Sequence, residues 1–99
     1  MEEEKRNARL HAIVEGTVQG VGFRYFVQDV ANRFSVTGWV RNRWDGTVEV
    51  LAEGERSQLE QLLAALRRGP RSAQVTGVNF TWQEFSGELS GFRIKQTGS

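Results

Sequence analysis

The chain has 99 residues, of which 38% are hydrophobic and 25% charged, with a single proline; this is the composition of a globular protein rather than a disordered one. The length suffices for one domain with one hydrophobic core and excludes a second domain. The formal net charge of +1 provides no protein-wide field that would attract nucleic acid or anionic lipid, so any affinity for anions must be local.

The first seven residues form a charged segment, which we expect to be a disordered or frayed tail ahead of one domain at residues 8–97. A signal peptide would need an apolar stretch at this position, and no apolar run in the chain approaches the length of a membrane span. The sequence therefore predicts a cytoplasmic protein that does not bind a membrane.

A strand is predicted at residues 10–16, and it leads into a glycine-rich turn that ends at Arg24. The glycines Gly16, Gly20 and Gly22 allow backbone conformations that other residues avoid, so successive N–H groups can point at a common centre. The N-terminus of the following helix and the planar guanidinium of Arg24 both favour an anion at that centre. The same pattern also fits a structural turn with Arg24 in solvent, and it lacks the Gly-Lys-Ser/Thr ending of a nucleotide-binding loop.

An amphipathic helix is predicted from Phe23 onward. Its apolar residues recur at the spacing of one helix face, which indicates packing on a sheet: Phe23, Phe26, Val27, Val30, Ala31 and Phe34. Strands are expected at residues 36–42 and 47–52, joined by a turn that contains Asp45-Gly46, a hairpin signal. The hairpin places Asn42 near its tip, where asparagine is also common as an ordinary turn residue.

A second helix is predicted after residues 53–55. Ser57 and Glu60 have the spacing of a capping box, and the alternative is an earlier start in which Glu55 and Arg56 are already helical. The helix ends at Gly69-Pro70, and the residues expected to face the core are Leu59, Leu62, Leu63 and Leu66. Strands at residues 75–84 and 92–95 complete the order β-α-β-β-α-β plus a short C-terminal strand. This order predicts an α+β, ferredoxin-like fold, a split βαβ sandwich in which an antiparallel sheet carries two helices on one face.

Two motifs in the chain resemble those of the acylphosphatases. The signature of that family is similar to Gly16-Thr17-Val18-Gln19-Gly20-Val21-Gly22-Phe23-Arg24, and a second family stretch is similar to Gly38-Trp39-Val40-Arg41-Asn42, followed by Asp45-Gly46-Thr47-Val48 and Gly54. The resemblance covers residues 10–95 and implies an acylphosphatase-like domain with the same fold. It places the catalytic arginine of the family at Arg24 and the catalytic asparagine at Asn42. The family often ends its last strand with Phe-x-Ile-x-Tyr, whereas Gln96 stands at the Tyr position here, which concerns terminal packing rather than chemistry.

The family hydrolyses acyl phosphates, mixed anhydrides of a carboxylic and a phosphoric acid, to carboxylate and phosphate. Because a carboxylate is a good leaving group, this reaction needs no metal, cofactor or strong general acid. The chain has no cysteine, one histidine and only the aspartates Asp29 and Asp45, so neither a phosphoenzyme nucleophile nor a cluster of metal ligands is visible. We interpret His11 as structural, because no Asp, Glu or Ser partner lies beside it in the sequence.

We hypothesise direct in-line attack of water on the phosphoryl group, without a phosphoenzyme, because the chain shows no nucleophile or metal site. The backbone N–H groups of a phosphate-binding loop would hold the phosphoryl oxygens together with the Arg24 guanidinium; the loop consists of Gln19, Gly20, Val21, Gly22, Phe23 and Arg24. The Asn42 amide would orient the water, whose proton goes, by elimination, to a phosphoryl oxygen. The expected partners are a small acyl phosphate and, as a site ligand, inorganic phosphate or sulfate; nucleic acid is not expected, and a monomer is.

Three other interpretations remain at this point. RNA-recognition domains use the same split βαβ order, but they need aromatic residues on the two central strands, and residues 10–14 and 48–52 contain none. An acylphosphatase-like domain can also act on carbamoyl phosphate at the head of hydrogenase-maturation carbamoyltransferases, although such proteins carry cysteine-rich zinc elements that this chain lacks. A catalytically idle family member is the third, and the presence of both Arg24 and Asn42 argues against it.

Overall fold

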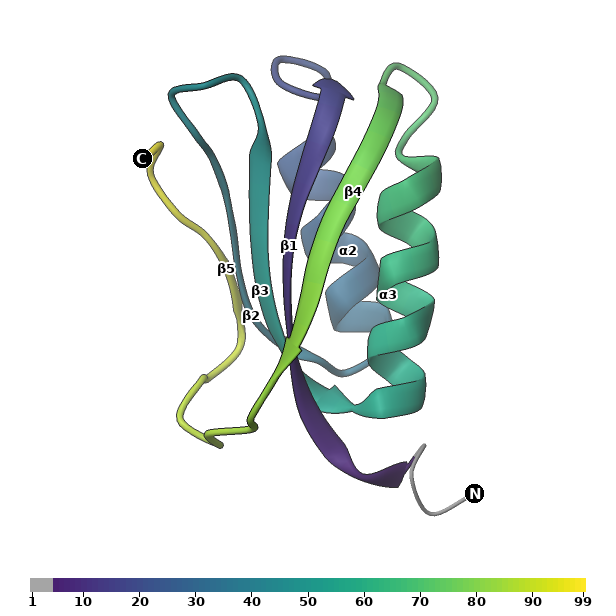
Figure 1. Ribbon diagram of the computed structural model, residues 1–99, viewed down its shortest axis with the longest axis vertical. Helices are drawn as coiled ribbons and strands as arrows, with labels where there is room; N and C mark the ends of the chain where they lie inside the picture. Colours follow the sequence, from purple (N-terminus) through teal and green to yellow (C-terminus); the bar gives the residue numbers. More distant parts are fainter. Residues whose placement is uncertain (1–4) are drawn as a thin grey trace.

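The computed structural model describes residues 5–99, so residues 1–4 of the predicted tail lie outside the described residues. The elements follow in the order β1 (Asn7–Thr17), α2 (Phe23–Arg33), β2 (Thr37–Asn42), β3 (Val48–Glu55), α3 (Arg56–Arg68), β4 (Gln74–Gln83) and β5 (Phe92–Ile94). Figure 1 shows both helices on one face of the sheet, as the sequence predicted. No helix in this part of the chain has the length and hydropathy needed to cross a membrane.

The sheet has the strand order β4-β1-β3-β2-β5. Its first four strands pair antiparallel, which confirms the ferredoxin-like arrangement, whereas β5 pairs parallel with β2. The predicted antiparallel sheet is therefore confirmed for four strands, and only the short C-terminal strand departs from it. The reason lies in the path of the chain: β4 ends where β2 begins, and residues 84–91 cross that end of the sheet and enter beside β2 in the same direction (Figure 1).

The core lies between the helices and the face of the sheet that they cover. Alternate residues of β1, β2 and β3 supply one side of it, as expected for strands with one buried face. The predicted helix stripes supply the other side, and Phe26 and Phe34 are partly buried against them. The fully or nearly fully buried residues include Leu10, Ala12, Val14, Val40, Val48, Val50, Phe23, Val27, Val30, Leu59, Leu62 and Leu66.

Two local predictions differ from the structure. The first strand begins at Asn7 rather than residue 10, because Asn7 pairs with Glu55 in β3, so at least this residue of the predicted tail belongs to the sheet. The capping box is also wrong: α3 begins at Arg56, directly after the extended residue Glu55, and no side chain caps it. Glu60 instead lies 3.5 Å from Arg56 as an ion pair one helix turn away.

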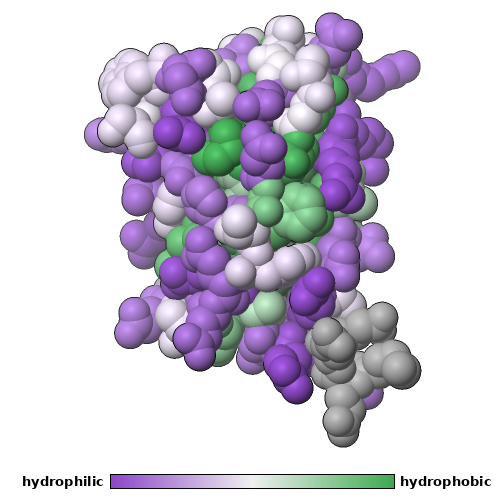
Figure 2. All heavy atoms as spheres, in the orientation of Figure 1, coloured by the Kyte–Doolittle hydropathy of each residue, from purple (hydrophilic) through white to green (hydrophobic). Residues whose placement is uncertain are grey.

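The uncovered face of the sheet is mainly hydrophilic around a smaller apolar area (Figure 2). Glu53 of β3 is 1% exposed and accepts hydrogen bonds from Arg9 Nε (2.7 Å) and from the backbone N–H groups of Ser86 (2.9 Å) and Gly87 (3.1 Å). Burial raises the pKa of Glu53, but these hydrogen bonds outweigh it and the pKa lies below its ordinary value. Glu53 thus anchors the crossing segment that leads to β5.

Candidate active site

The loop predicted to bind an anion connects β1 to α2 at one end of the sheet. Gly20 and Gly22 both have left-handed backbone conformations, with φ of 73° and 77°, and Gly22 is the N-cap of α2. Within residues 5–99, no hydrogen bond of the protein uses the backbone N–H groups of residues 19–24. These six consecutive donors are free to bind a ligand, which is unusual for backbone amides.

The loop is tied to the β2–β3 hairpin through the side chain of Gln19. Its Nε2 donates hydrogen bonds to the carbonyl oxygens of Arg43 and Thr47, each at 2.8 Å. Arg43 and Thr47 flank the hairpin turn and also pair with each other, because Arg43 N–H donates to Thr47 O at 2.9 Å. One side-chain amide therefore brings the loop to the residue that follows Asn42.

Asn42 is the last residue of β2 and pairs with Val48. By strand alternation it shares the helix-covered face with Gly38 and Val40, both of which are buried. Its Oδ1 is buried and has no hydrogen-bond partner in the described part of the chain. Its backbone oxygen accepts a hydrogen bond from Gly98 N–H at 3.1 Å, which fixes the strand end from the other side.

Arg24 lies in the first turn of α2 and is half-buried. Among residues 5–99 no carboxylate forms an ion pair with it, and the first turn of α2 holds no acidic residue. Figure 1 places the β1–α2 loop and the β2–β3 turn at the same end of the sheet. The structure thus brings together at one end the loop, the start of α2 with Arg24, and the strand end with Asn42.

The turn of the hairpin forms as the Asp45-Gly46 signal predicts. Asp45 Oδ1 accepts hydrogen bonds from Thr47 N–H (3.0 Å) and Thr47 Oγ1 (2.6 Å), and these bonds lower the pKa of Asp45. Trp44 stands at the tip with 77% of its surface exposed. Asp45 therefore shapes the turn, and its carboxylate is occupied by Thr47.

His11 has an acidic partner that its sequence neighbours did not reveal. Its Nε2 lies 2.7 Å from Glu49 Oε2, and Arg41 Nε donates to Glu49 Oε1, also at 2.7 Å. Burial raises the pKa of Glu49, but its hydrogen bonds with His11 and Arg41 outweigh it and leave the pKa lowered. The partner comes from β3, so it lies 38 residues away in the chain. His11 and Arg41 thus bind the two oxygens of the Glu49 carboxylate on the uncovered face, where the three side chains support the sheet.

Three contacts at this end were missed by the sequence analysis: the side-chain bonds of Gln19, the bond from Gly98 to Asn42, and a bond from Ser72 Oγ to Val21 O at 2.8 Å. Each joins residues more than twenty positions apart, and no local pattern signals such a pair. Among residues 5–99, no three His, Cys, Asp or Glu side chains gather as metal ligands would.

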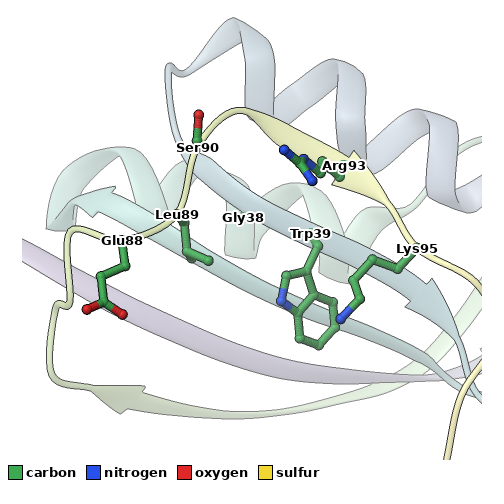
Figure 3. A pocket seen from close by; sticks show the side chains of 7 residues that line it. All are labelled: Gly38, Trp39, Glu88, Leu89, Ser90, Arg93 and Lys95. Atoms are coloured by element: carbon green, nitrogen blue, oxygen red, sulfur yellow. The ribbon is translucent and has the colours of Figure 1, made fainter.

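A separate pocket of about 330 Å³ lies between β2 and the segment around β5 (Figure 3). Lys95 Nζ lies 4.5 Å from the ring centre of Trp39 at its border. Neither the loop at residues 19–24 nor Asn42 lines this pocket. Its lining consists of Gly38, Trp39, Glu88, Leu89, Ser90, Arg93 and Lys95.

Fold and loop together define a small α+β protein with free amides at a strand-to-helix turn, the kind of site that suits a phosphate group. The acylphosphatase family model matches residues 10–94. An acylphosphatase of Pelotomaculum thermopropionicum is 49% identical over 87 residues, covering 88% of this chain and 95% of that protein, and one of Bacillus velezensis is 53% identical over 83 residues, covering 84% and 89%. The crystal structure of acylphosphatase from Bacillus subtilis superposes with a TM-score of 0.86 at 41% identity, covering 89% of this chain and 98% of that one.

The chain belongs to the acylphosphatase family, hydrolases that act on acyl phosphates. This confirms the resemblance on which the sequence analysis relied.

Proposed function

We propose that this acylphosphatase hydrolyses its substrate by direct in-line attack of water, without a metal ion and without a phosphoenzyme. The observation that carries the proposal is the set of backbone N–H groups at residues 19–24, which have no hydrogen-bond partner within residues 5–99 and end at Arg24 in the first turn of α2. Amides and guanidinium would hold the phosphoryl oxygens and stabilise the charge that they carry in the transition state. Phosphate or sulfate, which share this geometry, would bind at the same place.

Asn42 is proposed to orient the attacking water. The buried, unpartnered Oδ1 supports this role, because such an atom gains a hydrogen bond when a water molecule binds it. A carboxamide cannot act as a base, so the proton of the water would pass to a phosphoryl oxygen of the substrate. The leaving carboxylate needs no protonation, and positioning is then the main task of the protein.

The roles of Arg24 and Asn42 are tested by substitution, with benzoyl phosphate as the substrate. Arg24→Ala and Asn42→Ala should each lower kcat by at least ~10²-fold, as the loss of a transition-state donor does. Arg24→Lys should lower kcat almost as much, because an ammonium group lacks the planar, forked set of N–H donors of a guanidinium. Matched controls are Arg33→Lys and Asn32→Ala, exposed residues near the other end of α2. An Asn42→Ala enzyme with near wild-type turnover would show that the water-positioning role is wrong.

The absence of a phosphoenzyme is tested by the stereochemistry at phosphorus. One in-line displacement by water inverts the configuration of a chiral phosphoryl group, whereas a covalent intermediate requires two displacements and retains it. Retention would therefore contradict direct attack.

The physiological acyl group is a separate question, and carbamoyl phosphate is the specific alternative. Comparing kcat/KM for acetyl, carbamoyl and benzoyl phosphate distinguishes the two: a marked preference for carbamoyl phosphate would favour the alternative. A cytoplasmic location and a monomeric state stay predictions from the sequence.

A further inference from the structure

The connection between α3 and β4 supports the phosphate loop from behind. Ser72 Oγ donates a hydrogen bond to Val21 O at 2.8 Å, and Ala73 N–H donates to Pro70 O at 3.0 Å in the turn that carries Ser72. Gly69, at the end of α3, is buried so closely against the ring of Phe23 that a Cβ there would lie 3.1 Å from Cε2. Figure 1 shows this connection and the β1–α2 loop at the same end of the molecule.

The carbonyl that Ser72 binds belongs to the same peptide unit as one of the free amides. Val21 C=O and Gly22 N–H lie in one plane and point in opposite directions. With Val21 O held by Ser72, the Gly22 N–H is directed away from Ser72, and it is one of the free donors of the loop. The hydroxyl therefore sets the direction in which this donor points.

Sterics alone do not fix this direction. Gly22 has φ of 77°, and no heavy atom lies within 4 Å of the position that a Cβ would occupy. Glycine populates both signs of φ about equally well, so the backbone of Gly22 does not by itself fix the orientation of the peptide that joins it to Val21. A reversed peptide would present the Val21 carbonyl oxygen, rather than an N–H, to a phosphoryl oxygen and would repel it.

We propose that Ser72 is a positioning residue of the anion site, whose hydroxyl holds the Val21–Gly22 peptide in the orientation that binds a phosphoryl group. The inference rests on the proposed function of the loop. Ser72 itself touches neither substrate nor the reacting atoms in this proposal. Because the reversed peptide only competes with binding, a bound phosphoryl group selects the competent orientation, and the loss should appear in affinity rather than in kcat.

The test compares wild type with Ser72→Ala, Ser72→Thr and the control Ser90→Ala, a serine in an exposed segment outside the loop. Four quantities are measured for each: kcat and KM for benzoyl phosphate, the inhibition constant of inorganic phosphate, and Tm. Ser72→Ala should raise both KM and the phosphate inhibition constant by roughly 3- to 10-fold, the equilibrium factor of one neutral hydrogen bond, with kcat within about twofold of wild type. Ser72→Thr, which keeps the hydroxyl, should restore both constants, and Ser90→Ala should leave them unchanged.

An independent readout is the Gly22 amide itself. Phosphate titration followed by ¹⁵N NMR should shift the Gly22 resonance in wild type and require a several-fold higher phosphate concentration in Ser72→Ala. A Ser72→Ala enzyme with wild-type KM and phosphate inhibition constant overturns the role of Ser72 alone, whether or not its Tm falls. A wild-type enzyme that neither binds phosphate nor hydrolyses benzoyl phosphate overturns the proposed function, and this inference with it.

Discussion

The side chain of Gln19 offers the sharpest perturbation of the site, because it alone joins the loop to the hairpin by side-chain hydrogen bonds within residues 5–99. Gln19→Met keeps the length of the side chain and removes the amide, so two bonds of 2.8 Å are lost and two carbonyl oxygens lose a donor. At about 1 kcal/mol for each neutral bond, we expect the free energy of unfolding to fall by about 2 kcal/mol. We also expect kcat/KM to fall by about 10- to 100-fold, because small misplacements of catalytic groups are costly.

The assay pairs urea denaturation with steady-state kinetics on benzoyl phosphate. Gln28→Met is the matched control: Gln28 Nε2 also donates to a backbone oxygen, that of Phe92 at 3.0 Å, but it joins the middle of α2 to β5 and makes no bond to the loop or the hairpin. It should lose about 1 kcal/mol of stability and keep its kinetics. If Gln19→Met showed wild-type kcat/KM despite the expected loss of stability, the loop and Asn42 would be positioned independently of each other, and the reasoning would fail.

Three further predictions concern Glu53, Gly38 and metal dependence. Because the pKa of Glu53 is lowered in the folded protein, its contribution to stability is complete above its unfolded pKa of about 4.5 and is lost as the pH falls through the folded value. Glu53→Gln should therefore lower the free energy of unfolding by about 3 kcal/mol at pH 7. Denaturation measured over a range of pH should show this difference from wild type shrinking in acid. Gly38→Ala should cost about 2–4 kcal/mol in urea denaturation, because a Cβ would overlap the carbonyl oxygen of Leu51, which is backbone and cannot turn aside. Turnover of benzoyl phosphate should survive incubation with a chelator; activity that is lost and then restored by a divalent cation would contradict the metal-free mechanism.

The fold was predictable because its signals are local and periodic. The stripe from Phe23 to Phe34 and the leucines of α3 recur at the helical period, and Asp45-Gly46 marks the hairpin. The direction of β5 was not predictable in this way. It depends on which end of the sheet the chain crosses after β4, and residues 84–91 contain no pattern that encodes a path across three other strands.

In the candidate site, too, the local features were predictable from the sequence and the contacts between distant residues were not. Glycine spacing and the position of Arg24 predicted a loop with converging amides; these amides have no partners inside residues 5–99, and their binding of an anion stays a prediction. The residues that hold the loop were not predictable. Ser72 and Val21 are 51 positions apart, and an exposed serine after a helix is ordinary in any sequence. Only the assembled fold shows which distant hydroxyl or amide reaches which carbonyl.

The free amides also explain why the loop is held through its carbonyl oxygens and side chains rather than through its N–H groups. A loop that keeps its N–H groups available for an anion cannot use them to stabilise itself, and glycines at positions 20 and 22 add conformational freedom that folding must overcome. The groups that remain for hydrogen bonds to the rest of the protein are the carbonyl oxygens and the side chains of the loop. The protein uses both, since Ser72 binds the Val21 carbonyl and Gln19 reaches out to the hairpin. It follows that both kinds of support can be tested by mutation at this end: Gln19→Met removes two hydrogen bonds and should lower the free energy of unfolding about twice as much as Ser72→Ala, which removes one.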